Sequence, residues 1–174
     1  VLEPIVYVAT IGNNIYATLA EAIKAAKAGD VVTIVAGEYT GDLNVNKAIT
    51  VEGVGEVNIN GRLNVTANGA TVKNLNVTNS NGNAVYVSGK DITIENCNIK
   101  GSNGFRSCYA NGLVTIKDST ITGSTYGIHF DGSAGGEIVI DNCVITGWTS
   151  FARTISKVTI ANSEFADGNY NQLR

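Results

Sequence analysis

The chain has 174 residues, with 12 basic and 15 acidic side chains, a formal net charge of −3 and no run of like charge. This length suits one domain, and the lack of a basic stripe argues against a nucleic-acid partner. No apolar stretch approaches the roughly 18 residues of a membrane-spanning helix, so no membrane span is expected. The 20 Gly, one Pro and no Met, with many Asn and Thr, indicate short strands joined by tight turns.

The N-terminal region is predicted to be a hairpin and a helix over residues 1–30, followed by a repeat region over 31–174. Strands at Ile5–Ile11 and Ile15–Tyr16 flank a Gly12-Asn13-Asn14 turn. Both parts belong to one structural domain.

A helix is predicted over residues 18–28. Thr18 is its candidate N-cap, and Glu21, three residues later, completes a capping box. Gly29 is expected to end it. Because the helix carries one apolar stripe, we expect it to cover the open first coil of the region that follows.

A short line of the form T-I-x-N recurs along the rest of the chain. Its central apolar residues are Val72, Ile94, Ile116, Ile140 and Ile160. The steps between them are about 20 to 24 residues, a period typical of stacked solenoids, since one such unit cannot bury its apolar face alone.

Three columns of alternating apolar residues indicate three strands per coil. The first comprises Val32/Ile34, Ile49/Val51, Val72, Ile92/Ile94, Val114/Ile116, Ile138/Ile140 and Val158/Ile160. The second comprises Leu43/Val45, Leu63/Val65, Val85/Val87, Cys108/Ala110 and Ile128/Phe130. The third comprises Leu75/Val77, Cys97/Ile99, Ser119/Ile121, Cys143/Ile145 and Ser163/Phe165. The predicted fold is an all-β, right-handed parallel β-helix of about six to seven coils.

A column of amides marks one corner of the predicted coil. Asn tolerates left-handed backbone angles and bonds neighbouring backbone, as a sharp corner requires. We interpret the column as a structural ladder whose members are Asn74, Asn96, Asp118, Asn142 and Asn162.

The three cysteines are predicted to be free, buried thiols. Cys97 and Cys143 occupy equivalent places two repeats apart, with Ser119 between them. At about 4.8 Å per layer they would lie near 10 Å apart, too far for a disulfide.

From about Val31 to Arg174 the chain resembles the pectate-lyase-like superfamily of right-handed parallel β-helices. Its first part is also similar to the cap and first coil of β-helix modules in bacterial surface proteins and phage structural proteins. The segments that carry this second resemblance are Tyr16–Ile23 (YATLAEAI), Ala28–Asp30 (AGD), Ala36–Tyr39 (AGEY) and Ile49–Gly53 (ITVEG).

Enzymes of this superfamily cleave acidic polysaccharides. The resemblance implies either a calcium site of several carboxylates with an Arg or Lys base, or three close aspartates with a His and a Lys. Neither set can be matched in this sequence, so no catalytic set, metal or cofactor is predicted. The nearest fragment is His129 with Asp131, about 6.6 Å apart on the outward face of a strand. The alternative for this pair is a solvated strand end.

The outward column of the second strand is the predicted interaction surface. Tyr86, Tyr109 and His129 are expected to rise along one face at about 4.8 Å intervals, with Asn44 and Asn64 continuing the column. Amphipathic rings on a flat sheet can stack on sugars. The alternative is a ladder that only stabilises the sheet. Arg106 and Trp148, expected in or near the turns between coils, are secondary candidates for ligand binding.

The leading hypothesis is that the chain is a non-catalytic structural or binding module. It would be extracellular, on a cell surface or on a virion, and would serve in adhesion or as a decoration or tail component. Its partner would be a glycan or a neighbouring protein subunit. Alternatives are a polysaccharide lyase or glycoside hydrolase, and a stand-alone carbohydrate-binding protein.

The last predicted repeat is Lys157–Phe165, and no amphipathic segment follows it. Because an open coil end exposes apolar side chains and unpaired backbone, we expect the end at Arg174 to be covered. The cover would be further sequence of a longer chain or a neighbouring subunit.

Overall fold

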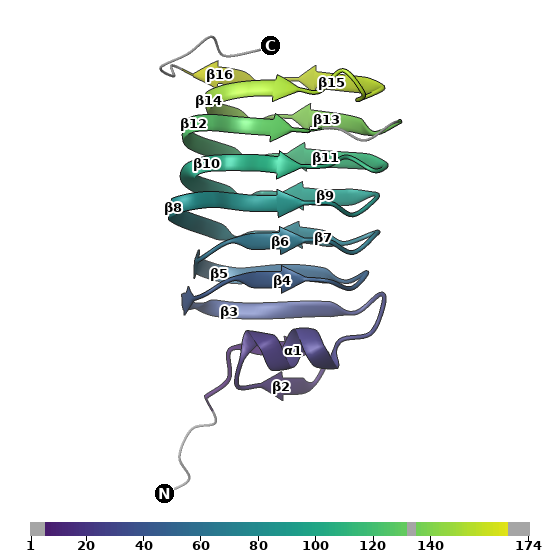
Figure 1. Cartoon of the computed structure of the whole chain (residues 1–174). Coiled ribbons are helices and arrows are strands. Elements are labelled where there is room, and N and C mark those ends of the chain that lie inside the picture. Colours follow the sequence, from purple (N-terminus) through teal and green to yellow (C-terminus); the bar gives the residue numbers. More distant parts are fainter. Residues whose placement is uncertain (1–5, 132–134, 167–174) are drawn as a thin grey trace, which may run out of the picture.

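The computed structural model describes residues 6–131 and 135–166. Within them the chain winds into a β-solenoid of about six turns, with the helix at the N-terminal end (Figure 1). Its strands form one 16-stranded sheet in which, beyond the N-terminal hairpin, neighbouring strands come from successive coils and run parallel. The predicted fold class is therefore confirmed.

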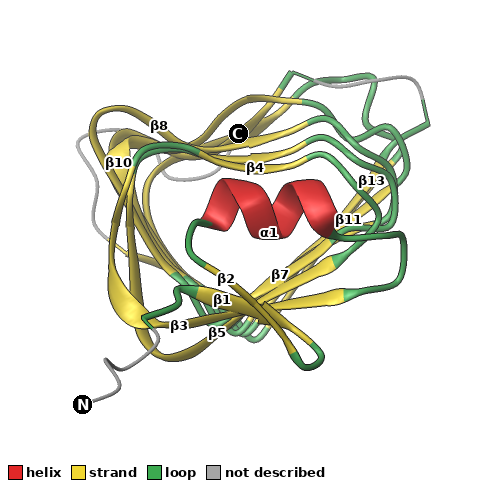
Figure 2. Ribbon diagram, turned by 90° about the horizontal axis from the view of Figure 1, so that it is seen from below, coloured by secondary structure: helices red, strands yellow, loops and turns green. Residues whose placement is uncertain are grey.

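The N-terminal cap consists of a hairpin and a short helix. β1 (Ala9–Ile11) pairs antiparallel with β2 (Asn14–Tyr16) and with the first strand of the solenoid. The predicted hairpin began at Ile5, which lies outside the described residues, and its first strand begins at Ala9 instead. Figure 2 shows α1 (Leu19–Ala25) lying across the opening of the coils, as predicted.

The helix begins as predicted but ends earlier. The Thr18 hydroxyl accepts a hydrogen bond from the Glu21 N–H at 3.2 Å, which satisfies one free donor of the first turn. The prediction that it continues to residue 28 is wrong, because Ala26 has an extended ψ of 143°. The ammonium group of Lys47 caps this end, donating to the carbonyl oxygens of Lys24 and Ala26 at 2.6 and 2.7 Å.

One side of the solenoid is a stack of parallel strands that carries the first predicted column. Its strands are β3 (Val31–Thr40), β5 (Thr50–Asn60), β7 (Thr71–Lys73), β9 (Ile92–Glu95), β11 (Leu113–Lys117), β13 (Glu137–Asp141) and β15 (Lys157–Ala161). Val72, Ile94, Ile116 and Ile140 pair in this order across the coils. The first coil differs by two residues from the prediction, since Val32 pairs with Val51.

The other two predicted columns run together into long, bent strands. Their strands are β4 (Leu43–Val45), β6 (Leu63–Val65), β8 (Asn76–Val87), β10 (Asn98–Cys108), β12 (Thr120–Phe130), β14 (Val144–Phe151) and β16 (Glu164–Ala166). The first half of β8 pairs with β5 and its second half with β6, so one strand turns the corner between two sides of the coil. The same bend repeats in β10 and β12, which pair along most of their length.

The core is a continuous stack of aliphatic side chains with one aromatic pair. Ile94, Ile116 and Ile121 are 0% exposed, and the rings of Phe105 and Phe130 stack with centroids 6.3 Å apart. A fully buried Ile contributes about 1.5–3 kcal/mol to stability.

The three cysteines are free and buried in this core, as predicted. Burial disfavours the thiolate, so it raises the pKa of Cys97 to about 11 and that of Cys108 to about 12. Burial also raises the pKa of Cys143.

The predicted amide column forms a corner with left-handed backbone. Its residues are Asn74, Asn96, Asp118, Asn142 and Asn162, with φ of 61°, 49°, 52°, 51° and 50°. Amide groups bond along the axis in part of it: the Asn96 amide donates to Asn74 at 2.8 Å, and the Asn142 amide to Asp118 at 2.7 Å. The left-handed backbone and the bonds between amides are those that a structural ladder requires.

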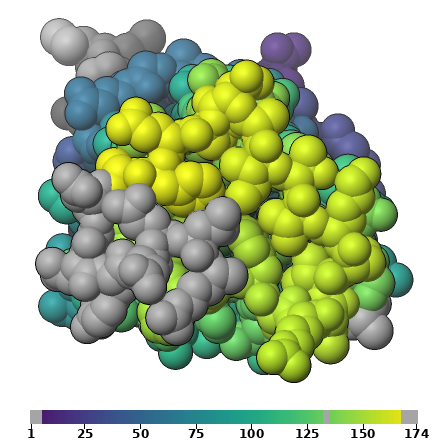
Figure 3. All heavy atoms as spheres, turned by 90° about the horizontal axis from the view of Figure 1, so that it is seen from above, coloured from purple at the N-terminus to yellow at the C-terminus, as the bar shows by residue number. Residues whose placement is uncertain are grey.

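The last described strands, β15 and β16, form the outermost layer of the C-terminal end (Figure 3). Val158 is 36% exposed there, whereas its partner one coil below, Ile138, is 0% exposed. The prediction that the open coil end is covered concerns residues after Ala166, which lie outside the described residues.

Candidate functional site

An extra residue in β10 decides which side chains face outward. Phe105 pairs with Val85 of the coil below and Ile128 of the coil above, but it is Cys108 that pairs with Phe130. Two residues, Arg106 and Ser107, therefore occupy the length that one residue spans in the neighbouring coils. Ser107 absorbs the irregularity with a φ of 55°.

This irregularity corrects the predicted column of Tyr86, Tyr109 and His129. Tyr109 is exposed, but its N–H bonds the Val87 carbonyl at 2.8 Å, which places it level with Ser88, two residues beyond Tyr86. Arg106 takes the place between Tyr86 and His129. It lies within β10 and not in a turn, contrary to the prediction.

The N-terminal part of the column is as predicted, although one member is buried. Asn44, Asn64 and Tyr86 pair in register across β4, β6 and β8. Asn64 is 8% exposed, and its amide donates to the Asn44 carbonyl oxygen at 2.9 Å. The Asn64 side chain therefore stabilises the stacking of one coil on the next, whereas Asn44 and Tyr86 face outward.

Above Tyr86, three side chains from three successive coils stack on one another. The guanidinium carbon of Arg106 lies 4.0 Å from the centroid of the Tyr126 ring. The Tyr126 ring is stacked on the Trp148 indole, with centroids 4.9 Å apart and planes at 14°. We call Arg106, Tyr126 and Trp148 the aromatic platform. Cation–π and stacked aromatic contacts of this kind contribute about 0.5–1.5 kcal/mol each.

A chain of hydrogen bonds runs beside the platform. The Nε2 atom of His129 lies 2.9 Å from an Asp131 carboxylate oxygen, and its Nδ1 atom lies 2.5 Å from the Ser150 hydroxyl. The His129 ring also contacts Tyr126, with centroids 5.0 Å apart. We call Asp131, His129 and Ser150 the polar chain. His129 and Asp131, expected about 6.6 Å apart on one face, are in direct contact, and Ser150 is an additional partner.

Glycines at the bend of the long strands make the platform possible. A methyl group on Gly123 would overlap the carbonyl oxygen of Tyr126, and one on Gly147 would crowd the carbonyl oxygen of Gly123. Below them, the Asn103 amide donates to Asn83 at 2.9 Å and its oxygen accepts from the Tyr126 N–H at 3.3 Å. The bend is therefore packed backbone on backbone, which holds the Tyr126 ring against its neighbours.

Sequence reasoning missed Tyr126 and Ser150 as site residues. Tyr126 pairs with Trp148, and His129 with Ser150, so each pair is separated by about one repeat. Aromatic residues spaced by one repeat were the signal that could have found the platform. Trp148 also lies within β14, not in a turn as expected.

On the stack of β5, β7, β9 and β11, acidic and basic side chains of successive coils pair with one another. Glu52, Lys73, Glu95 and Lys117 follow one another in register. Lys73 pairs with Glu52 at 3.5 Å and Lys117 with Glu95 at 3.2 Å. At the amide corner, a polar hollow of about 300 Å³ is lined by the structural ladder.

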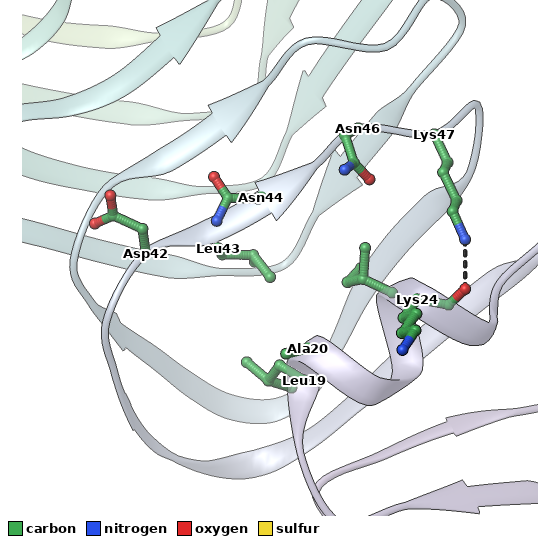
Figure 4. A pocket seen from close by; sticks show the side chains of 9 residues that line it. Leu19, Ala20, Lys24, Asp42, Leu43, Asn44, Asn46 and Lys47 are labelled. Atoms are coloured by element: carbon green, nitrogen blue, oxygen red, sulfur yellow. Dashed lines mark hydrogen bonds between the residues drawn. The ribbon is translucent and has the colours of Figure 1, made fainter.

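A second hollow lies at the N-terminal end, between α1 and β4 (Figure 4). It measures about 320 Å³ and has Leu19, Ile23 and Leu43 in its wall, with Asn44 and Lys47 among its polar lining. Lys47 bonds the carbonyl groups at the end of α1 and so attaches the cap to the first coils. The hollow is the space left where these two parts meet.

The part of the chain that the structure describes has neither a cluster of metal ligands nor a membrane-crossing helix. Residues 6–131 and 135–166 contain no group of three or more His, Cys, Asp or Glu side chains arranged to hold a metal ion. No helix in the same part of the chain has the length and hydrophobicity needed to cross a membrane.

Comparisons with known proteins identify the fold. No family model matches the chain, and no curated protein matches its sequence. Among solved structures, it is similar to a pectin methylesterase from Aspergillus niger, with a TM-score of 0.69 and 16% identity over 91% of this chain and 67% of that chain. The chain thus has the right-handed parallel β-helix fold.

Proposed function

We propose that the chain is a glycan-binding β-helix module, and that the aromatic platform is its binding surface. The observation that carries this proposal is the continuous stack of Arg106, Tyr126 and Trp148 on three successive coils. The polar chain beside it supplies hydrogen-bonding groups.

The chemistry of the surface suits a sugar. Sugar rings have apolar C–H faces and hydroxyl edges. Both faces of the Tyr126 ring are covered, by Arg106 and by Trp148, so a sugar would meet the outward edges of the stack. Arg106 brings up to five N–H donors, while Asp131 and Ser150 bring acceptors for hydroxyl groups.

The platform is also well ordered for binding. All three side chains are half-buried, so one side of each is packed while part remains in contact with solvent. They stand on paired strands, β10, β12 and β14, and not on free loops. Binding to such a surface requires little ordering of side chains, which favours affinity.

The similar solved structure adds support of a general kind. Its name associates this fold with pectin, a polysaccharide. A polysaccharide or an oligosaccharide is therefore the ligand class that we favour over a protein partner.

The chain has a single tryptophan, which allows a direct test. A glycan array would identify candidate ligands, and titration of the best one would then be followed by the intrinsic fluorescence of Trp148. We expect saturable quenching or a shift of the emission maximum in the wild type. Tyr126→Ala should weaken binding about fivefold or more, because stacked aromatic contacts contribute about 1 kcal/mol each.

Tyr7→Ala is the matched control, since Tyr7 is an exposed tyrosine near the N-terminus, outside the platform and the polar chain. It should bind as tightly as the wild type. Unchanged affinity of a folded Tyr126→Ala variant, or the absence of any ligand on the array, would contradict the proposal.

The proposal also includes the place where the chain acts and its role there. We propose an extracellular or virion surface, where the β-helix displays the platform outward. A neighbouring protein subunit is the alternative partner, and it would give a silent glycan array with co-purification of a defined complex. A polysaccharide lyase or a glycoside hydrolase would instead release unsaturated products or reducing sugars from an acidic polysaccharide.

A further inference from the structure

The polar chain has the arrangement of a nucleophile, a base and an orienting carboxylate, and glycan binding does not require it. We propose that Ser150 is the nucleophile of an ester-hydrolysing centre, with His129 as general base and Asp131 as the group that orients the imidazole. The substrate class is a short acyl ester, such as an O-acetyl group. That a sugar carries this ester rests on the proposed function, whereas the hydrolytic centre itself does not.

The two hydrogen bonds of His129 carry this inference. The Ser150 hydroxyl lies 2.5 Å from Nδ1 and an Asp131 carboxylate oxygen lies 2.9 Å from Nε2. A neutral imidazole satisfies both when Nε2–H donates to Asp131, which leaves the Nδ1 lone pair to accept from the serine hydroxyl. A serine bonded to a base that is itself oriented by a carboxylate is the general signature of an activated nucleophile.

Backbone pairing holds the three groups together. His129 and Ser150 are register partners on β12 and β14, in adjacent coils. Asp131 follows β12 directly, and the alternation of the strand puts it on the same outward face as His129. The side chains of His129 and Asp131 are 21% and 39% exposed, so the centre opens to solvent and a substrate can reach it.

The reaction balances without a metal or a redox partner. The Ser150 oxygen forms a bond to the ester carbonyl carbon as its proton passes to Nδ1 of His129. The C–O bond to the alcohol then breaks, and the alcohol leaves with that proton. Water next attacks the acyl-serine and gives a proton to His129. The carboxylic acid departs, and that proton returns to the Ser150 oxygen.

The charges beside the centre fit these steps. Asp131 stabilises the imidazolium that forms in each half of the reaction. Trp148 and Tyr126 then offer an apolar surface to the rest of the substrate.

A fluorophosphonate probe tests the proposal without knowledge of the natural substrate. It phosphonylates an activated serine and so should label the wild type at Ser150, as located by peptide mass mapping. Ser150→Ala should abolish labelling, and His129→Ala should slow it at least about 100-fold, the usual contribution of a general base. Ser102→Ala is the control, since Ser102 is a serine on β10 whose hydroxyl bonds only a backbone carbonyl, that of Ser80; it should label like the wild type.

A second measurement uses p-nitrophenyl acetate, whose hydrolysis should depend on Ser150 and His129 in the same way. Circular dichroism would establish that each variant is folded. No labelling of the folded wild type between about pH 6 and pH 9, or equal labelling of the His129→Ala variant, would overturn the proposal. The probe carries no sugar, so labelling of the wild type does not depend on glycan binding, and titration with a glycan does not depend on hydrolysis. Failure of the hydrolytic centre and failure of glycan binding are therefore distinguishable.

Discussion

The Trp148 indole lies nearly parallel to the Tyr126 ring one coil below, with centroids 4.9 Å apart and planes at 14°. The contact joins β12 to β14 on the outer surface, where Arg106 covers the other side of the stack. Because Trp148 is the single tryptophan, its emission reports on this contact alone.

The first prediction concerns this stack. Tyr126→Ala should expose the Trp148 indole to water and shift its emission maximum to longer wavelength, with a loss of stability of about 1–3 kcal/mol. Tyr7→Ala, at an exposed tyrosine near the N-terminus, is the control and should change neither. An unchanged spectrum of Tyr126→Ala would show that the rings do not stack in solution.

The second prediction tests the core column. Ile94→Asp or Ile116→Asp should abolish cooperative folding, because each side chain is 0% exposed and a carboxylate there has no partner. Thr93→Asp, on the outward face of the same strand, should fold. Denaturant melts followed by circular dichroism give the comparison, and a cooperative transition of either isoleucine variant would count against the coil assignment.

A third prediction separates backbone strain from hydrogen bonding at the amide corner. Asn96 has a φ of 49° and donates to Asn74 at 2.8 Å. Asn96→Gly and Asn96→Ala both lose the bond, but only Ala is strained in the left-handed region, by roughly 1–2 kcal/mol. The Gly variant should therefore be the more stable of the two in urea melts. Equal stability would mean that the corner does not require this backbone conformation.

The fourth prediction concerns the bend beneath the platform. Gly123→Ala should destabilise the fold by roughly 2 kcal/mol or more, because the added methyl group overlaps the Tyr126 carbonyl oxygen. Gly112→Ala is the control, since its nearest contacts are Asp91 and Lys90 side-chain atoms at 3.2 Å. If both variants melt alike, the close backbone approach at the bend is absent.

The fifth prediction follows from the buried thiols. The pKa of Cys108 is raised to about 12 by burial, whereas in the unfolded chain it is about 8.5. The unfolded state therefore loses its thiol proton first as the pH rises, so the thiol's contribution to stability is complete below about pH 8.5 and declines above it. At pH 10 this loss is about 1–2 kcal/mol.

Cys108→Val removes the titrating group and nearly conserves its volume. Between pH 7.5 and pH 10, the wild type should lose more unfolding free energy than this variant, by about 1–2 kcal/mol in urea melts. Identical pH dependence of the two proteins would argue against a buried Cys108.

Much of the fold could be predicted because its signals are local and repeated. Inward residues alternate along each strand and recur once per coil, so Val72, Ile94 and Ile116 indicate their own stacking. The left-handed corner at Asn96 and the N-cap at Thr18 depend only on nearby backbone, which the residue type itself reveals. Buried free thiols followed from the register of Cys97 and Cys143.

The site depends instead on contacts between coils. One additional residue in β10, absorbed at Ser107, moves Tyr109 out of the predicted column and brings Arg106 over Tyr126. Nothing in the local pattern distinguishes that irregularity from a simple alternation, because a register shift is stabilised by the strands on both sides. The sequence by itself therefore determined the solenoid and its stacked core, whereas only the tertiary structure decided that Arg106, Tyr126 and Trp148 meet and that Ser150 lies against His129. Local periodicity specifies which residues face inward, but the packing of one coil on the next selects the outward neighbours.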